Sequence, residues 1–416
     1  MQVKLLPHQK ESLDQLKNFN RVGLFWDMGL GKTFGGSEKA LQLGDLILLV
    51  CPKSLVDGWI EHFNTNYPYL TVSDLRKKKH PTIADVFIIT YDLVWRRKEY
   101  FDNLINFTLM LDESSYIQNE TSKRTKGILK LHEKNCILLS GTPTAGRYEK
   151  LYTQIQLLGW NISKQEFWDR YIVYKNINVG VGFPIKKVLG YKNVEELKEQ
   201  LSYYGAYFIK TEDVLELPEQ NDIFIKCKVP KLYKDFKKDL VAYPKSLVTD
   251  EEVEMLGDMS LKVLLYLRQL ASAYNDDKLE HFKDLIAGTE DRLIVFYNFN
   301  EELELLKSVI DRPISIVNGE IKDLEAYHKH NNSITLIQYQ AGSMGLNLQL
   351  ANKIIYYSPT LTAELFLQSK KRTHRIGQKN TCFYYYLVAG IEQQIYDTLA
   401  RREDYTLKLF EKGEYT

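Results

Sequence analysis

One stretch near the N-terminus, residues 22–33, restricts the fold more than any other. It reads Val-Gly-Leu-Phe-Trp-Asp-Met-Gly-Leu-Gly-Lys-Thr, an apolar run followed by two glycines and a Lys-Thr pair. The pattern predicts a strand over residues 22–26, a tight turn, and a helix that opens at Lys32. Inward-facing N–H groups of such a turn, together with the positive end of the helix dipole, can hold a polyphosphate.

The side chains of this turn predict a nucleotide site. Gly29 and Gly31 allow the backbone to bend sharply. Lys32 would contact the outer phosphates, and the Thr33 hydroxyl would complete the shell of a magnesium ion. The spacing departs from the strict Walker pattern, because Trp26 stands where its first glycine is expected. A glycine-rich turn with an exposed lysine is the alternative interpretation.

Length and charge limit the classes of protein to consider. A chain of 416 residues exceeds the usual size of one core, so two domains are expected. The apolar content of 44% and charged content of 26% are typical of a globular protein. Because the formal net charge is only +1, any surface that attracts nucleic acid must be local.

The cysteines and the hydropathy pattern bear on metal sites and location. The four cysteines are far apart and form no Cys-x-x-Cys pair, which argues against structural zinc and against a disulfide framework. No apolar run approaches membrane-spanning length, and the N-terminus lacks the layout of a signal peptide. We therefore expect a cytoplasmic protein without a membrane partner, in the host cytoplasm if the chain is phage-encoded.

Short apolar runs alternate with helical patterns in both halves of the chain. In the first half they predict strands at residues 46–50, 86–90, 109–111 and 136–139. In the second half the expected strands are 293–296, 314–317, 334–337 and 353–357. The fold class is therefore α/β with two parallel-sheet lobes, whose active edges lie outside the carboxyl ends of the strands.

The alternation stops between about residues 152 and 287. We expect helical additions there, on both sides of a hinge at residues 215–218. The predicted domains are thus 1–218, with a helical addition after about 152, and 219–416, with a helical addition up to about 287. Thr249-x-x-Glu252 predicts the start of one added helix.

An acidic pair follows the predicted strand at residues 109–111. Asp112 would hold the magnesium ion directly or through water, and Glu113 would orient and deprotonate the attacking water. A carboxylate pair at a strand end is common and is weak evidence alone. Together with the Gly-Lys-Thr turn it predicts ATP hydrolysis.

A basic segment, residues 368–378, lies far downstream. It reads Gln-Ser-Lys-Lys-Arg-Thr-His-Arg-Ile-Gly-Gln, and on a helix Gln368, Arg372 and Arg375 would share one face. An arginine supplied by a second domain can stabilise the charge that develops on a transferred phosphoryl group. A basic surface helix, or one that holds nucleic-acid phosphates, is the alternative.

In their order these motifs resemble the Swi/Snf-type branch of the superfamily two helicase-like ATPases, many of which also lack the first Walker glycine. The branch-specific features are the Asp-Met-Gly-Leu-Gly-Lys-Thr turn and Arg-x-Gly-Gln at residues 375–378. The other matching segments are 7–9, 52–55 with Trp59, 89–91, 112–113, 140–143, 213–218, 267–270, 341–347 and 391–396.

The resemblance implies two RecA-like lobes that bind ATP and Mg²⁺, with double-stranded DNA across both. It implies that Gln9 contacts adenine and that Arg372 and Arg375 act as arginine fingers. Residues that would couple nucleotide state to DNA grip are Ser140, Gly141, Thr142 and Gly345. Residues that would face the DNA backbone are Lys53, Ser54, Thr90, Ala341, Gly342 and Ser343. Taken alone, a residue such as Gln9 is more often a surface glutamine.

Two positions and one short segment depart from the family pattern. Ser115 stands where histidine is frequent, Asn298 where glutamine is usual, and residues 358–361 replace an acidic, tryptophan-containing stretch. Basic clusters that could contact DNA, or could be solvated surface, lie at residues 76–79, 96–98, 123–126 and 370–375.

The leading hypothesis is a DNA-stimulated ATPase that translocates on double-stranded DNA without separating its strands. One alternative is a strand-separating helicase on RNA or single-stranded nucleic acid. Another is an ATP-gated clamp or recruitment module. The abundance of lysine, asparagine, isoleucine and tyrosine would suit a phage or low-GC bacterial source.

Overall fold

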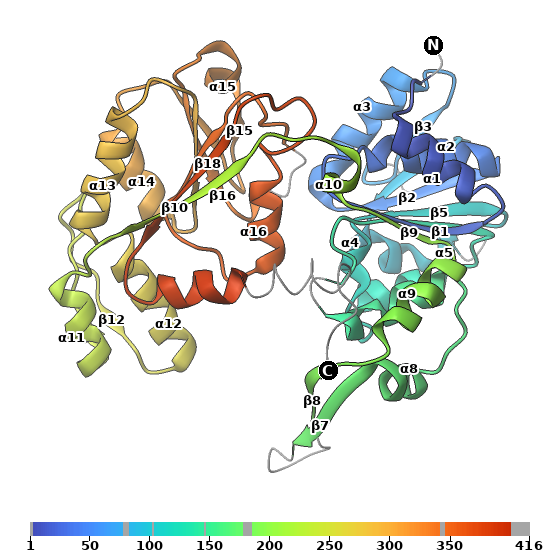
Figure 1. Cartoon of the computed structure of the whole chain (residues 1–416), viewed down its shortest axis with the longest axis horizontal. Helices are drawn as coiled ribbons and strands as arrows, with labels where there is room; N and C mark the ends of the chain where they lie inside the picture. The colour runs from blue at the N-terminus through green and yellow to red at the C-terminus, as the bar shows by residue number, and fades with distance from the viewer. Residues whose placement is uncertain are drawn as a thin grey trace. The chain divides into compact units, whose positions relative to one another are not determined.

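The protein is described here from a computed structural model that covers residues 3–77, 83–101, 104–144, 147–177, 185–341 and 346–400. The chain divides into two compact units, and the division falls between Leu215 and Glu216. Unit 1 runs from blue to green in Figure 1, and unit 2 from green to red. Each unit contains its own seven-stranded sheet.

Unit 1 is built on a sheet of seven strands in the order β3-β4-β2-β5-β6-β1-β9. Every neighbouring pair is parallel. The strands are β1 (Arg21–Trp26), β2 (Leu46–Cys51), β3 (Val72–Asp74), β4 (Val86–Thr90), β5 (Phe107–Asp112), β6 (Asn135–Leu139) and β9 (Ala206–Ile209). The strands predicted in this half are confirmed, and β3 and β9 extend the sheet at its two edges.

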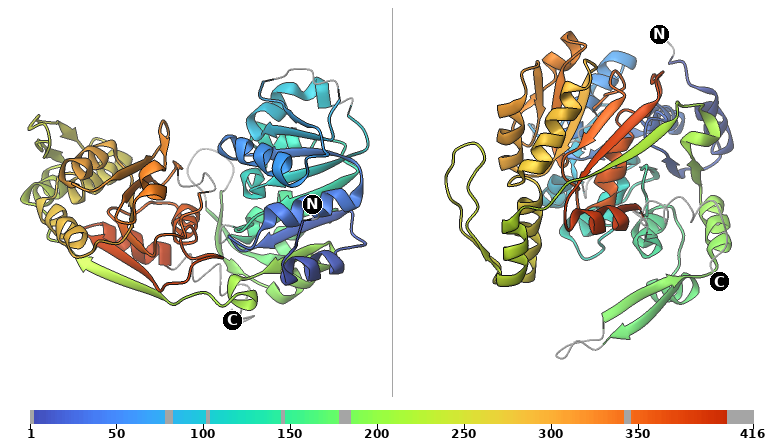
Figure 2. Two further views of the ribbon diagram at one scale, coloured as in Figure 1. Left: turned by 90° about the horizontal axis from the view of Figure 1, so that it is seen from above. Right: turned by 60° about the vertical axis from the view of Figure 1, so that its left-hand side comes forward.

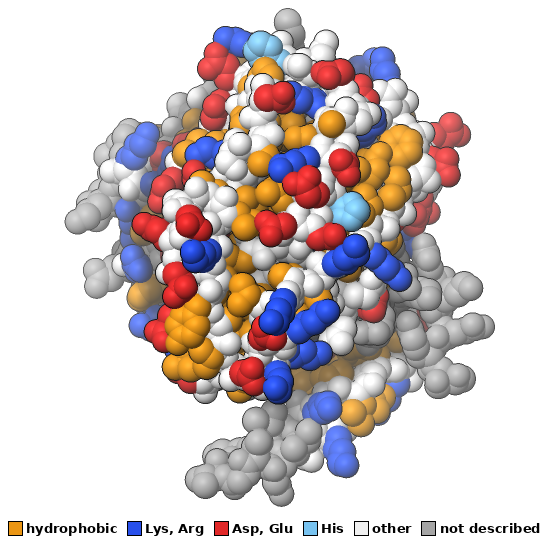
Figure 3. All heavy atoms as spheres, turned by 90° about the vertical axis from the view of Figure 1, so that its left-hand side faces the viewer, with side chains coloured by type: hydrophobic (Ala, Val, Ile, Leu, Met, Phe, Trp, Pro, Cys, Tyr) orange, Lys and Arg blue, Asp and Glu red, His pale blue; other side chains and the backbone are white. Residues whose placement is uncertain are grey.

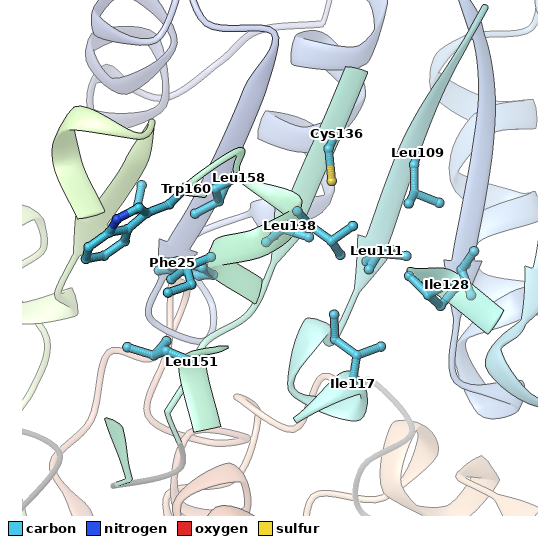
Figure 4. Packing of buried hydrophobic residues seen from close by; sticks show 14 of the residues in the cluster. Phe25, Leu109, Leu111, Ile117, Ile128, Cys136, Leu138, Leu151, Leu158 and Trp160 are labelled. Carbon is cyan, nitrogen blue, oxygen red and sulfur yellow. The ribbon is translucent and has the colours of Figure 1, made fainter. Parts of the chain in front are cut away.

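Alternate side chains of the central strands of unit 1 feed two separate cores. Leu109 and Leu111 of β5 and Leu138 of β6 join one cluster, and Met110 joins the other. Figure 4 shows the first cluster, with Trp160 at one side of it. Because both faces are covered, the strands read as continuous apolar runs. The helices around this sheet include α1 (Pro7–Gln15), α2 (Lys32–Leu43), α3 (Val56–Asn66), α4 (Tyr91–Val94) and α6 (Lys123–Ile128).

The addition that follows unit 1's first six strands is not helical throughout. Helices α7 (Tyr152–Leu157), α8 (Lys164–Tyr171) and α9 (Val194–Tyr203) are present, but β7 (Ile172–Ile177) and β8 (Ile185–Tyr191) form an antiparallel hairpin between the last two. The hairpin is the green pair of arrows that extends from unit 1 in Figure 2. The sequence predicted only helices in this region. The two strands were not predicted, because their apolar and lysine residues follow neither a helical nor a strand period.

Unit 2 is built on a second sheet of seven strands, in the order β10-β18-β17-β13-β16-β14-β15. All pairs are parallel except β14 with β15. The strands are β10 (Gln220–Lys226), β13 (Leu293–Tyr297), β14 (Ile314–Val317), β15 (Lys322–Asp323), β16 (Ile334–Gln338), β17 (Lys353–Tyr356) and β18 (Cys382–Val388). The prediction of two parallel-sheet α/β lobes is confirmed.

Helices cover both faces of the unit 2 sheet, as the right-hand view of Figure 2 shows. One face packs against α12 (Ser260–Ala271), α13 (Asp276–Ala287) and α14 (Asn300–Val309), and the other against α15 (Glu325–Lys329) and α16 (Ala363–Lys370). Helix α11 (Lys231–Asp239) and the short pair β11 (Val241–Ala242) and β12 (Met255–Leu256) precede α12.

The helix start predicted at Thr249-x-x-Glu252 is wrong. These residues lie between β11 and β12, and Glu252 forms an isolated bridge with Lys245. The Ser246 hydroxyl accepts the N–H groups of Val248 and Thr249, so the local side chains stabilise a turn instead.

Acidic and basic side chains are interspersed on the face of unit 2 that Figure 3 shows. Such mixing is consistent with the small net charge of the whole chain. Among the described residues, no helix combines the length and apolarity needed to cross a bilayer.

Candidate nucleotide-binding site and arginine segment

The turn after β1 has the geometry that the sequence predicts. Strand β1 ends at Trp26, and α2 begins at Lys32. Gly29 and Gly31 have φ angles of 89° and 76°, a region that favours glycine. The strand, turn and helix are therefore confirmed.

Helix α1 holds this turn through polar side chains. The Gln9 amide Nε2 donates to the carbonyl oxygens of Leu30, at 3.0 Å, and Gly31, at 3.3 Å. His8 Nε2 lies 3.0 Å from the same Leu30 oxygen. A Cβ atom on Gly31 would lie 2.3 Å from Gln9 Nε2, so glycine is needed for this approach as well as for its φ angle. Gln9 is thus bonded to the turn, and its contact with adenine stays a prediction.

Trp26, which replaces the first Walker glycine, is accommodated by a glycine elsewhere. Its side chain is fully buried. A Cβ atom on Gly35, one turn into α2, would lie 2.4 Å from the Trp26 ring. The loss of one glycine at the turn is therefore matched by a second glycine inside the helix, a signal visible in the sequence as Gly35-Gly36.

Lys32 projects back over the turn. Its Nζ donates to the carbonyl oxygens of Trp26, at 2.7 Å, and Asp27, at 3.1 Å. A Cβ atom on Gly141 would lie 3.3 Å from the same Nζ. The ammonium group therefore lies where the turn and the segment after β6 meet, among acceptors that an anion could replace.

Asp112 is the last residue of β5, and it is half-buried, with its carboxylate near that lysine. Its Oδ2 accepts a hydrogen bond of 2.7 Å from Trp59 Nε1. Burial raises the pKa of Asp112, while the Trp59 bond and the positive charge of Lys32 lower it. A bound cation would offset the burial cost, and oxygen ligands are those that Mg²⁺ prefers. The donor set of Asp112 and the Thr33 hydroxyl therefore fits the predicted ion.

Glu113 leaves the strand in an unusual conformation. Its φ angle is 53°, and it precedes a short helical turn over residues 114–117. The hydroxyl of Tyr91 donates to the Asp112 carbonyl oxygen at 2.9 Å. Backbone strain of this kind is frequent at functional sites, and here the surrounding contacts maintain it.

A side-chain relay that the sequence did not reveal joins the acidic motif to residues 140–143. Ser114 Oγ donates to Gln154 Oε1 at 2.7 Å, and Gln154 Nε2 donates to the Pro143 carbonyl oxygen at 2.6 Å. The buried Ser140 hydroxyl accepts from the Thr142 N–H at 3.1 Å. Gln154 is a candidate functional residue, but its distance of 40 positions from Ser114 left no signal in the sequence.

The turn is also tied to the end of unit 1. The N–H and hydroxyl of Thr211 both donate to Asp27 Oδ2 at 3.1 Å. Thr211 begins α10 (Thr211–Val214), which follows edge strand β9. The loop that carries Gly29 is therefore fixed from both α1 and α10.

The residues predicted to face DNA differ in exposure. Lys53 is exposed and Ser54 half-buried, whereas Thr90 and Ala341 are buried. Strands β2 and β4 pair with Cys51 opposite Thr90, so Lys53 and Thr90 lie at one edge of the sheet. Gly342, Ser343 and Gly345 lie outside the described residues.

Two basic clusters in unit 1 come together around one ring. Arg96 and Lys123 lie 5.3 Å and 5.0 Å from the centre of the Trp95 ring. Beside the ring is a cavity of about 190 Å³, lined by Val94, Trp95, Lys123, Lys126, Gly127, Lys130 and Leu131. We call these lining residues, together with Arg96, the Trp95 surface.

The cluster that begins at Arg76 is different. Its guanidinium pairs with Asp74 at 2.9 Å and with Asp57 at 2.5 Å. Lys78 and Lys79 lie outside the described residues. The Arg76 charge is therefore already balanced by two carboxylates and is a weaker candidate for a DNA contact.

The prediction that Gln368, Arg372 and Arg375 share a helix is wrong. Helix α16 ends at Lys370, and both arginines lie in the turns that follow. The Arg372 carbonyl oxygen accepts from Leu348 N–H at 3.2 Å, and Gln378 Nε2 donates to Ala351 O at 2.9 Å. These bonds to the 348–351 segment take the place of a helical ladder.

Residues 368–378, which we call the arginine segment, are anchored within unit 2. Arg375 is half-buried, its Nη1 donates to Leu346 O at 3.4 Å, and burial lowers the pKa of its guanidinium. His374 Nε2 lies 2.8 Å from the carbonyl oxygen of Pro218, the last residue of the predicted hinge. The segment and the hinge are thus linked by one side chain.

Two of the departures from the family pattern contact each other. Asn298 Nδ2 donates to Ser358 Oγ at 2.8 Å and to the Pro359 carbonyl oxygen at 3.0 Å. The Ser358 hydroxyl donates in turn to the buried Glu302 carboxylate at 2.9 Å. The changes at positions 298 and 358 therefore form one interaction.

Comparisons with known proteins agree with this arrangement. Residues 8–279 match the family model of the SNF2-related domain, and residues 277–377 match that of the helicase conserved C-terminal domain. A Bacillus subtilis protein named as an ATP-dependent helicase/translocase, YwqA, is 25% identical over 90% of this chain and 45% of its own length. The human DNA annealing helicase and endonuclease ZRANB3 is 25% identical over 94% of this chain and 39% of its own.

A solved structure is also similar, the Sulfolobus solfataricus SWI2/SNF2 ATPase core in complex with dsDNA. It is 20% identical, covers 99% of this chain and 96% of that one, and superposes with a TM-score of 0.47. The chain spans less than half the length of the two curated relatives above.

Proposed function

Because the chain belongs to the SNF2-related family of helicase-like ATPases, we propose that it is a motor that ATP hydrolysis drives along double-stranded DNA without separating the strands. The observation that carries the proposal is the placement of Lys32 beside the half-buried carboxylate of Asp112, at the carboxyl ends of parallel strands. This is where α/β sheets bind ligands.

In this proposal, residues of unit 1 hold the nucleotide. The N–H groups of the turn and the Lys32 ammonium bind the phosphates, as Lys32 exchanges two carbonyl acceptors for phosphate oxygens. Asp112 and Thr33 would hold Mg²⁺, which neutralises charge on the phosphates. Glu113 orients and deprotonates the attacking water. Arg372 and Arg375 stabilise the charge that spreads over the γ-phosphoryl oxygens.

The relay of Ser114, Gln154 and Pro143 supports a coupling role for residues 140–143. Loss or gain of a γ-phosphate would shift the backbone at Glu113, and Ser114 is the next residue. The hydrogen bond from the Ser114 hydroxyl to Gln154, and the bond from Gln154 to the Pro143 carbonyl oxygen, would transmit this displacement to residues 140–143. Ser115 need not supply the contact that a histidine makes in many relatives.

Double-stranded DNA is the proposed partner, held through its phosphates. Lys53 and the Trp95 surface offer cationic groups that suit the phosphate oxygens of the DNA backbone. Contacts of this kind position a protein on the backbone and carry no sequence information. A protein that moves along duplexes of any sequence needs contacts that do not depend on the base sequence.

ATPase assays and triplex displacement test the proposal together. We expect duplex DNA to stimulate hydrolysis more than single strands do, and the protein to displace a third strand from a duplex track. The Lys32→Ala variant should do neither while its circular dichroism spectrum is unchanged. Displacement of an oligonucleotide from a fork would favour the strand-separating alternative, and stimulation without triplex displacement would favour a clamp.

A further inference from the structure

Three side chains with metal-binding atoms converge at the end of β10 in unit 2. They are Cys227, Asp277 and His281, and their ligand atoms all lie within 4.8 Å of one another. Cys227 is buried and directly follows β10. Asp277 and His281 are half-buried, one turn apart on α13, and His281 Nε2 lies 3.6 Å from Asp277 Oδ2.

The donor set is that of a zinc site. Zinc is bound by thiolate, imidazole and carboxylate groups at about 2.0–2.3 Å, usually as a tetrahedron. Ligand atoms on such a tetrahedron are roughly 3.3–3.8 Å apart, so the three side chains need to close by about 1 Å. Sulfur and nitrogen donors disfavour magnesium and calcium, which take oxygen ligands.

We propose that Cys227, Asp277 and His281 bind a zinc ion, with water as the fourth ligand. The wide spacing of the cysteines argues against structural zinc, because structural zinc sites commonly contain pairs of cysteines close in sequence. Here one cysteine meets an Asp-x-x-x-His pair that starts 50 positions downstream, and only folding brings the three together.

A local contact orients one of the three ligands. Asp277 Oδ2 accepts a hydrogen bond of 2.7 Å from Lys228 N–H, which fixes the carboxylate beside the residue that follows Cys227. Because zinc binds the thiolate form of cysteine, it would displace the thiol proton of Cys227 when it binds.

The position of the site suggests what the ion does. Strand β10 is an edge strand that, among the described strands, pairs only with β18, and most of its residues are exposed. It also starts two residues after Pro218 of the hinge. A metal bond between Cys227 and α13 would fasten the far end of this strand to the body of unit 2.

Cobalt titration of the full-length protein tests the site directly. We expect one Co²⁺ per chain and an intense near-ultraviolet absorption band from thiolate-to-cobalt charge transfer. The Cys227→Ser variant should lose the band. The His281→Gln variant, changed at a half-buried position, should weaken Zn²⁺ affinity by more than about tenfold, since even outer-shell changes cost that much.

Thermal unfolding provides an independent readout, with His330→Gln as the matched control because His330 is an exposed histidine of the same unit. Zn²⁺ should raise the Tm of the wild type and of His330→Gln by roughly 3 °C or more, and Mg²⁺ should not. The proposal is overturned if the wild type shows no sulfur band, if the band survives in Cys227→Ser, or if Zn²⁺ stabilises His281→Gln equally.

Discussion

Units 1 and 2 share a seven-stranded, largely parallel sheet, but they place ionisable groups differently. In unit 1 the half-buried Asp112 lies at a strand end, beside Lys32 and the proposed nucleotide. In unit 2 the Lys278–Glu392 pair is fully buried in the body of the unit, at 2.6 Å. The charged groups of unit 1 thus lie where a ligand is proposed to bind, whereas those of unit 2 join α13 to the residues after β18.

The two units are also expected to respond to pH in opposite directions. His62 of unit 1 packs among the rings of Phe34, Trp59 and Tyr67, and burial lowers its pKa to about 4. Burial raises the pKa of Glu392 in unit 2 to about 7, against the effect of Lys278. Mild acid should therefore weaken unit 1 and strengthen unit 2.

The largest expected effect separates the proposed nucleotide binding by unit 1 from the proposed action of the unit 2 arginines on the transition state. Arg375→Ala should lower ATP hydrolysis about 10³-fold or more, because an arginine finger acts on the transition state. ATP affinity, measured by fluorescence with a labelled analogue, should change little, whereas Lys32→Ala should reduce both. Lys379→Ala, an exposed neighbour, is the control. Hydrolysis by Arg375→Ala at a tenth of the wild-type rate would refute the assignment.

The next effect concerns the buried pair of unit 2. Lys278→Met should lower the free energy of unfolding by about 3–5 kcal/mol, since Glu392 would be left as an unpaired buried charge. The double change Lys278→Met with Glu392→Leu should recover most of the loss. Urea unfolding measures both.

An exposed pair on the same helix is the control for this experiment. Lys283 and Glu280 are 2.8 Å apart, and Lys283→Met should change the free energy of unfolding by less than about 1 kcal/mol. If Lys278→Met proves as mild as Lys283→Met, the contrast between the two units disappears.

The pH dependence of unit 1 should be smaller. Below about pH 6.5 the unfolded chain binds a proton at His62 that the folded unit accepts only near pH 4, so stability is lost as the pH falls between these values. The loss should reach about 3 kcal/mol. His62→Gln should flatten this slope in denaturant titrations from pH 7 to pH 4, and His132→Gln, at an exposed site, should not.

Glu392 should give the stability of unit 2 a pH dependence of the opposite sign. Its folded pKa lies above the unfolded value, so the folded unit binds more protons between about pH 4.5 and 7, and stability falls as the pH rises through that range. Equal slopes of the same sign in His62→Gln and Glu392→Gln would contradict the comparison.

The regions of the molecule also differ in how much of their structure could be predicted from the sequence alone. Strands such as β2 and β5 were predictable because both faces are buried and the apolar runs are continuous. Edge strand β10 was not, because most of its residues are exposed. The turn at Gly31 could be predicted from local residues, since its backbone angles depend on glycine.

Contacts between distant segments account for what the sequence did not reveal. Helical spacing suggested one face for Arg372 and Arg375, but Gln378 and Leu348 bond across to other segments and end the helix at Lys370. The hydrogen bonds from Trp59 to Asp112 and from Ser114 to Gln154 likewise join residues that lie 53 and 40 positions apart. Residue spacing contains no information about such bonds.

The smallest expected effect compares surface charge in the two units. Lys123→Ala on the Trp95 surface should weaken duplex binding about fivefold at moderate salt and reduce the slope of log affinity against log salt by about 1, because one phosphate contact is lost. Lys329→Ala, an exposed lysine of unit 2 paired with Glu325 at 2.5 Å, should leave the slope unchanged. Fluorescence anisotropy over a salt series measures both slopes. If the two variants behave alike, Lys123 is solvated surface, and the DNA backbone must be held by Lys53 and its neighbours at the sheet edge instead.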